Sequence, residues 1–109
     1  MTEDLRLADA KHRLAYVQAR AALLDCERGR HDAALARAAE ALSSARALER
    51  ATEMLVAHAV LSRCALACGD RADADAHLDA VARFEAAGVA TWALDIARRA
   101  QECGRKQHA

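Results

Sequence analysis

A short glycine-led pattern occurs twice in this chain, about forty residues apart. Its two copies are residues 29–35 (Gly-Arg-His-Asp-Ala-Ala-Leu) and residues 69–74 (Gly-Asp-Arg-Ala-Asp-Ala), and each lies between two apolar-periodic segments. A fixed period of this length is typical of stacked two-helix repeats, in which each unit covers its apolar face with its neighbour. The pattern therefore predicts an all-α fold of antiparallel helical hairpins stacked as a short repeat.

The composition supports helix and a single domain. The 109 residues include no proline and four glycines, and the most frequent residue is alanine, which has the strongest helix propensity. A chain of this length has room for one domain with a modest core. We expect one helical-repeat domain over residues 1–104 and a frayed polar tail over residues 105–109.

Charge and hydropathy argue against nucleic-acid and membrane partners. Sixteen basic and sixteen acidic side chains cancel, so no overall field draws the chain to nucleic acid or to an acidic membrane surface. No apolar run reaches the roughly eighteen residues that span a bilayer. The chain opens with the acidic Met-Thr-Glu-Asp, which is unlike a basic signal peptide. These features predict a cytoplasmic protein.

Five helical segments are expected from the apolar periodicity. They cover about residues 3–28, 32–48, 53–68, 71–87 and 92–103. In the first segment the expected buried stripe is Leu7, Leu14, Val17, Ala21 and Leu24, and in the second it starts at Leu35.

Glycines and short polar residues mark the expected ends of these helices. Glycine tolerates the left-handed conformation that ends a helix, and the expected stops are Gly29, Gly69, Gly88 and Gly104. A short polar side chain can accept a free backbone N–H at a helix start, and the expected caps are Asp32, Thr52 and Thr91.

These residues resemble the tetratricopeptide repeats. That family has a glycine in the turn between helices, a small residue five positions later and another small residue seven beyond that, because the two helices cross closely. The two copies have Gly29, Ala34 and Ala41, and Gly69, Ala74 and Val81, at these positions. Asp25 and Ala65 stand where the family usually has a large aromatic residue. With its period near forty, the chain looks most like the divergent repeats of bacterial signal-transducing ATPases and large transcriptional regulators, where a join similar to residues 84–94 recurs.

The resemblance implies a concave face that binds a protein or peptide partner. The groove positions of the family fall on Tyr16, Arg20, Leu23 and Glu27 in the first repeat, and on Val56, Val60 and Arg63 in the second. Arg20 and Arg63 can grip a carboxylate through their planar guanidinium groups, and Tyr16 offers amphipathic contact area. The alternative is that both arginines form the solvated edge of an amphipathic helix.

The cysteines admit a metal-binding interpretation and a packing interpretation. Cys64 and Cys68 lie one turn apart on the third expected helix, a spacing that can present two thiolates to a soft metal. Both also lie on the apolar stripe, where free cysteine packs as a small hydrophobe. Neither Cys26 nor Cys103 belongs to a ligand pair in the sequence. We therefore expect packing cysteines, with no metal and no cofactor.

The histidines and carboxylates are also expected to be structural. His58 lies on the apolar face of the third helix, which is typical of a core histidine with a satisfied hydrogen bond. Asp73 and His77 stand one turn apart at the start of the fourth helix, where they could hold a cation weakly. Carboxylates in a first turn more simply complement the helix dipole.

Three classes of function stay open, and an enzyme is not expected. The chain has no nucleophile elbow, no glycine-rich phosphate loop and no suggestive spacing of cysteine, histidine and carboxylate. The leading interpretation is a cytoplasmic protein-interaction module that scaffolds or regulates. One alternative is a sensor with a small molecule or metal between helices near Trp92, Cys64 and Cys68. Another is a homodimer that covers the apolar ends of the stack at Leu7 and Leu14 or at Trp92.

Overall fold

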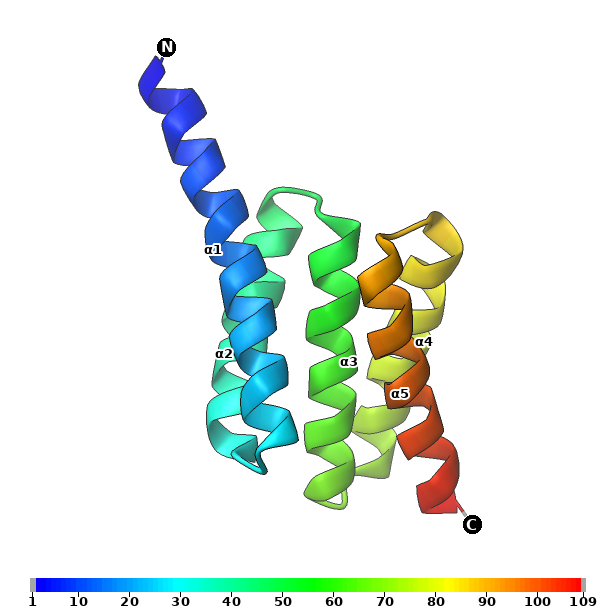
Figure 1. Ribbon diagram of the computed structural model, residues 1–109. Helices are drawn as coiled ribbons and strands as arrows, with labels where there is room; N and C mark the ends of the chain where they lie inside the picture. Colours follow the sequence, from blue (N-terminus) through cyan, green and yellow to red (C-terminus); the bar gives the residue numbers. More distant parts are fainter. Residues whose placement is uncertain (1, 109) are drawn as a thin grey trace.

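Five antiparallel α-helices make up the computed structural model (Figure 1), which describes the backbone of residues 2–108 and the side chains of residues 13–104. The helices are α1 (Thr2–Glu27), α2 (His31–Ala47), α3 (Ala51–Ala67), α4 (Arg71–Ala87) and α5 (Thr91–His108). No strand occurs among the described residues. The prediction of an all-α fold with five helices is confirmed.

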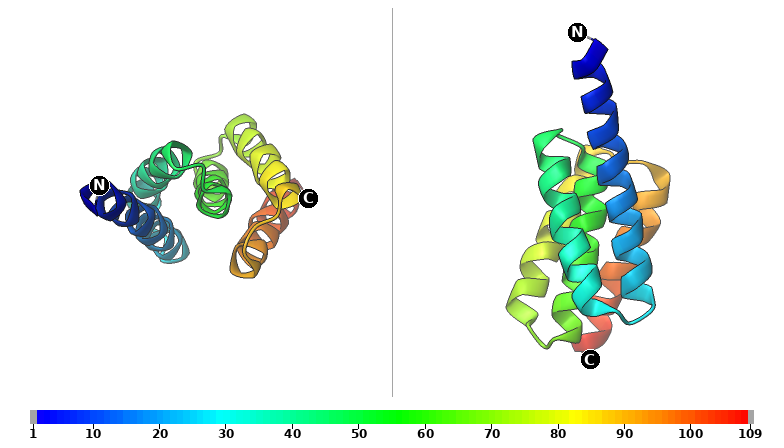
Figure 2. Two further views of the ribbon diagram at one scale, coloured as in Figure 1. Left: turned by 90° about the horizontal axis from the view of Figure 1, so that it is seen from above. Right: turned by 90° about the vertical axis from the view of Figure 1, so that its left-hand side faces the viewer.

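The helices form two layers around α3. Helices α1, α3 and α5 lie side by side on one face, with α2 and α4 behind them (Figure 1). Seen along the helices, α1 and α5 flank α3 on that face (Figure 2, left). We call it the groove face, after the family positions expected to line it. Helix α3 packs against each of the other four. It is therefore the most buried element, with Leu55, Val56 and Val60 fully excluded from solvent.

Three of the four turns share one geometry, which explains the forty-residue period. Gly29, Glu49 and Gly69 take left-handed φ values of 78°, 53° and 81°. Each donates its N–H to the carbonyl three residues earlier, and the next residue donates to the carbonyl five residues before it. These paired bonds satisfy the free carbonyls at a helix end. Because α2, α3 and α4 are each 17 residues long, two helix-and-turn units make one sequence period.

The fourth turn is built differently and corrects one expected cap. Gly88 ends α4 with a φ of 89°, as expected, but the N–H of Ala90 donates to the Thr52 hydroxyl at 3.2 Å. Thr52 lies inside the first turn of α3, which begins at Ala51 with no side-chain cap. The Thr52 hydroxyl thus links α3 to the residue that precedes α5.

The other expected caps are also wrong. Asp32 lies inside the first turn of α2, where its charge favours the helix dipole without a capping hydrogen bond. Thr91 is the first residue of α5, and the preceding Ala90 accepts the first helical hydrogen bonds. Asp70 caps α4 instead, because its carboxylate accepts the N–H of Asp73 at 3.1 Å.

Gly104 does not end α5, which continues through it to His108. Residues 105–108, expected as a frayed tail, continue this helix. A Cβ atom at Gly104 would lie 2.8 Å from the Cδ1 atom of Leu78, and Arg71 donates to the Gly104 carbonyl at 2.7 Å. Gly104 therefore permits a close approach of α5 to α4.

Alanine, rather than leucine, lines the packed face of α1. Ala15, Ala19 and Ala22 are fully buried. Leu14, Val17 and Leu24, which were expected to be buried, are 48%, 58% and 45% exposed, and Leu35 of α2 is 47% exposed. Leu7 lies outside the residues with described side chains. The alanine stripe and the leucine stripe have the same helical period. The alanine stripe is the buried one because small side chains let the helices approach closely.

Two buried carboxylates are paired with arginines. Asp25 lies where the family resemblance leads to a large aromatic, and its Oδ2 atom is 3.1 Å from the Nε atom of Arg37. Glu53 is 1% exposed in the first turn of α3, and Arg50 donates to its two oxygens at 2.9 and 3.2 Å. Both carboxylates sit near helix ends that an arginine can reach from solvent.

Candidate functional site

Side chains from α1 and α5 meet in front of α3, on the groove face. The rings of Tyr16 and Trp92 are 5.5 Å apart at 78°, an edge-to-face contact. The guanidinium carbon of Arg20 lies 5.3 Å from the centre of the Trp92 ring, within cation–π distance. Further along, Glu27 and Arg99 approach to 3.9 Å. We call Tyr16, Arg20 and Trp92 the aromatic–arginine cluster.

The predicted partner-binding residues divide into two groups. Tyr16, Arg20 and Glu27 are exposed on the groove side of α1, and Leu23 and Arg63 are half-buried. Val56 and Val60 have no exposed surface and belong to the core. These two valines cannot touch a partner, because the inner face of α3 is covered by its four neighbouring helices. The aromatic ring that completes the cluster, Trp92, was expected beside a ligand in the sensor alternative or at a dimer contact, and was not among the predicted partner-binding residues.

A shallow cavity continues the aromatic–arginine cluster along α1. Its volume is about 220 Å³, and it is lined by Arg20, Leu23, Leu24 and Glu27. Two leucines provide apolar surface between one cation and one anion. Such a cavity can accept an apolar side chain next to a hydrogen-bonding charged group.

A second cluster joins Cys26, His31 and Cys64, which we call the thiol–histidine cluster. The two Sγ atoms and a ring nitrogen of His31 all lie within 4.8 Å of one another. The turn at Gly29 brings the first residue of α2 beside the last turn of α1, and α3 packs against both helices. Three separate helices therefore place these three side chains together.

The polar atoms of this cluster are largely withdrawn from water. Cys26 is 5% and Cys64 1% exposed. The Sγ atom of Cys64 lies 3.7 Å from the His31 carbonyl oxygen, and the Nδ1 atom of His31 is buried with no hydrogen-bond partner among the described residues. A buried nitrogen without a partner is uncommon in folded proteins and calls for an explanation.

The two thiols of the cluster share their protons unequally. A hydrogen bond from Cys64 lowers the pKa of Cys26 to about 6, against the cost of burial, and the nearby Arg63 and His31 lower it further. That hydrogen bond to Cys26, together with burial, raises the pKa of Cys64 well above its usual range. The hydrogen bond between the two thiols thus favours loss of the first proton from Cys26 and its retention on Cys64.

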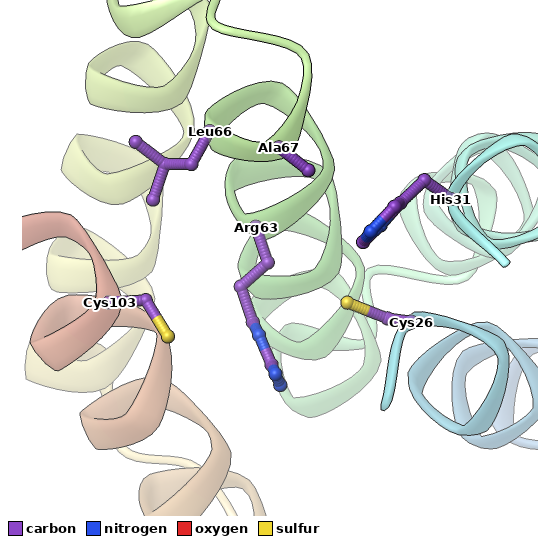
Figure 3. Close-up of a pocket in the computed structure, with 6 residues that line it drawn as sticks. All are labelled: Cys26, His31, Arg63, Leu66, Ala67 and Cys103. Atoms are coloured by element: carbon purple, nitrogen blue, oxygen red, sulfur yellow. The ribbon is translucent and has the colours of Figure 1, made fainter. Parts of the chain in front are cut away.

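The cluster opens on a cavity of about 170 Å³ between α1, α2, α3 and α5 (Figure 3). Arg63 extends into the space between Cys103 on one side and Cys26 with His31 on the other (Figure 3). The remaining lining residues are Leu66 and Ala67. The cavity thus gathers three potential metal ligands and one cation.

The pairing of the cysteines differs from the sequence-based expectation. Cys64 lies beside Cys26, so the expectation that Cys26 has no ligand partner is wrong. Cys68 is exposed, although it was expected on the apolar stripe. Cys68 follows the last residue of α3 and belongs to the exposed turn at Gly69, and no spacing in the sequence reports a contact between three helices. The short separation of Cys26 and His31 around Gly29 was the one available signal.

His58 is a core histidine with a hydrogen bond, as expected. Its Nδ1 atom lies 2.9 Å from that of His77, and its ring stacks on Phe84 at 5.8 Å. Burial lowers the pKa of His58 to about 4, and His77, Arg46 and Arg83 add to the effect. His77 in turn lies 3.6 Å from Asp73. This network lines neither of the two cavities described above.

No family model matches this chain, and no curated protein or solved structure matches it. Among the described residues, no helix has the length and apolar character needed to cross a membrane. The function must therefore be inferred from the groove and the thiol–histidine cluster.

Proposed function

We propose that this chain is a tetratricopeptide-like protein-interaction module that acts in the cytoplasm as a scaffold or regulator. The partner segment lies along the groove face of α1 and α5. The observation that carries this proposal is the aromatic–arginine cluster of Tyr16, Arg20 and Trp92. Tryptophan, tyrosine and arginine are the residues that most often dominate the binding energy of protein interfaces.

The cluster is suited to binding because its side chains are held in place before a partner arrives. Tyr16 is 44% exposed while its ring packs on Trp92, and Arg20 is positioned by the same ring. Side chains that are already ordered lose less conformational entropy on binding. The adjoining cavity lined by Arg20, Leu23, Leu24 and Glu27 suits a partner with an apolar side chain next to a carboxylate.

The repeat assignment is supported by the turns and by the close helix crossings. Three turns repeat one hydrogen-bond pattern. The small residues expected at the crossings, Ala34, Ala41, Ala74 and Val81, are all completely buried. Balanced charge favours a partner recognised through specific contacts over one attracted by a broad field.

Affinity capture with matched charge reversals tests this function. The chain is immobilised, and partners are captured from a cytoplasmic extract of the native cell with the wild type, Arg20→Glu and Arg83→Glu. Arg83 is exposed on α4, a helix that lies behind the layer of α1, α3 and α5 (Figure 1). We expect a defined partner that the Arg20 variant loses and the Arg83 variant keeps. Equal capture by both folded variants would contradict a groove-binding partner.

Self-association through α1 is a second candidate, favoured by its exposed apolar face. Leu14, Val17 and Leu24 of α1 all have exposed side chains. Leu24 and Cys64 are forty residues apart and so occupy equivalent positions of the two repeats. Cys64 contacts the preceding hairpin at His31, so Leu24 is placed to contact a hairpin that precedes its own. We propose that a second copy covers this face. Light scattering should then show a dimer that Val17→Glu dissociates, and a wild-type monomer would contradict it.

A further inference from the structure

We propose that Cys26, His31 and Cys64 bind one thiophilic metal ion with a filled d shell, Zn²⁺ or Cu⁺, where α1, α2 and α3 meet. This inference is independent of the partner-binding groove. It begins from the position of the three donor atoms, which lie within 4.8 Å of one another.

The donor spacing is close to that of a metal site. An ion about 2.3 Å from each sulfur and about 2.0 Å from an imidazole nitrogen holds its ligands roughly 3.5–3.8 Å apart. The three donors already lie within 4.8 Å of one another, so a shift of about 1 Å, of the size that small side-chain rotations supply, brings them to this spacing. The backbone of α1, α2 and α3 can therefore stay as it is.

The donor types select the metal. Two thiolates and one imidazole favour Zn²⁺ and Cu⁺ over Mg²⁺ and Ca²⁺, which prefer oxygen ligands. The buried Nδ1 atom of His31 has no hydrogen-bond partner among the described residues. Coordination of a metal ion by the imidazole would explain why this polar ring is buried beside the two thiols. Because cysteine binds metals as the thiolate, ion binding displaces any thiol proton to solvent.

The surroundings fit the charge and the coordination number of such an ion. Two thiolates with Zn²⁺ are neutral, and with Cu⁺ they carry one negative charge that the neighbouring Arg63 can balance. The adjoining cavity of about 170 Å³ leaves room for a fourth ligand. Cys103 lines that cavity from α5 (Figure 3). Three protein ligands with an open fourth position are a common zinc arrangement.

A bound ion would join the first hairpin to the second. Cys26 and His31 lie at the two sides of the α1–α2 turn, whereas Cys64 belongs to α3. A metal ion that binds only the folded state raises the free energy of unfolding. The increase grows with the logarithm of the ratio of the free metal concentration to the dissociation constant. The metal would therefore stabilise the stacking of the two repeats.

Metal titration of the reduced full chain tests the site. Zn²⁺ is titrated against a chromophoric chelator, Cu⁺ is titrated in the same way without oxygen, and Co²⁺ reports thiolate ligation by its charge-transfer absorption. We expect one ion per chain. Cys26→Ser, Cys64→Ser and His31→Gln should each weaken binding at least tenfold. Cys68→Ser, on an exposed cysteine of the same region, should bind as the wild type does.

The outcomes separate the proposal from its alternatives. A Co²⁺ spectrum without thiolate absorption in the wild type overturns the site and requires no variant to fold. Equal loss of binding in Cys68→Ser, unchanged binding in His31→Gln, or formation of a Cys26–Cys64 disulfide in place of binding also overturns it. Weaker binding by Cys103→Ser, in addition to the three losses, would support the site and identify Cys103 as the fourth ligand. The relative affinities for Zn²⁺ and Cu⁺ identify the preferred ion.

Discussion

Arg20 of α1 rests on the ring of Trp92 of α5, with its guanidinium carbon 5.3 Å from the ring centre. The two helices flank α3 on the groove face (Figure 2). This contact connects the first helix of the chain to the last. It also places a cation and two aromatic rings at one exposed position, because Tyr16 packs on the same tryptophan.

Replacing Trp92 with alanine should destabilise the fold and loosen α5. We expect a loss of about 2 kcal/mol, below the range for a fully buried tryptophan because Trp92 is half-buried. Chemical denaturation of Trp92→Ala, Arg20→Ala and the double variant, followed by circular dichroism, measures the coupling. A coupling energy of about 0.5–1 kcal/mol is expected for the cation–π pair, and purely additive effects would show that the contact is incidental.

The ion pair at the start of α3 should be sensitive to loss of its arginine. Glu53 is almost completely buried, and Arg50 provides two hydrogen bonds to it. Arg50→Ala leaves a buried carboxylate unpaired, so we expect a loss of about 2 kcal/mol, reduced from the fully buried case because the arginine is partly exposed. Arg98→Ala, which removes an exposed pair with Asp95, is the matched control. Equal stability of the two variants in urea would contradict a stabilising role for the pair of Arg50 with Glu53.

Stability should fall with acid because His58 stays neutral in the folded chain. Its pKa is lowered to about 4 by burial and by His77, Arg46 and Arg83, whereas an unfolded histidine titrates near pH 6.5. Between these two pKa values His58 binds a proton in the unfolded state and stays neutral in the folded state. The free energy of unfolding should decline as pH falls through this window, by up to about 1.4 kcal/mol per pH unit.

Denaturation curves between pH 7.5 and 4.5 check this slope. His58→Gln removes the buried imidazole and should therefore flatten the dependence of the free energy of unfolding on pH. A wild-type chain whose stability is constant from pH 7 to pH 5 would show that His58 is protonated in the fold.

The equivalent turns at Glu49 and Gly69 predict opposite effects of substitution. Glu49 pays a steric cost at its φ of 53°, whereas Gly69 does not at 81°. Glu49→Gly should therefore stabilise the chain by about 0.5–1 kcal/mol, and Gly69→Ala should destabilise it by about 1 kcal/mol. Thermal melting of both variants measures the difference. The same sign for both would mean that the turns are not equivalent.

The sequence predicts the helices well because their signals are local. Gly29, Gly69 and Gly88 end helices where expected. The turn at Glu49 is not predicted because its left-handed residue is not a glycine, and the tertiary structure holds it in that conformation. The buried stripe of α1 is misread because alanine and leucine stripes share one period, and only close packing between helices selects alanine.

The sites depend on contacts that local patterns do not contain. Tyr16 and Arg20 can be placed on one helix face from their spacing, but the completing ring of Trp92 comes from α5. Cys26 and Cys64 meet because α3 packs against the end of α1. Thr52 bonds to Ala90 rather than capping its own helix for the same reason.

Photo-crosslinking from position 16 tests the central claim, that the groove face binds the partner. Tyr16 is replaced with a benzophenone-bearing phenylalanine, and Asp79, exposed on α4, is replaced in the same way as a control. The account predicts a single crosslinked partner from position 16, absent from position 79 and lost when Arg20→Glu is added. A partner that crosslinks equally from position 79, or that persists in the Arg20 variant, would contradict it.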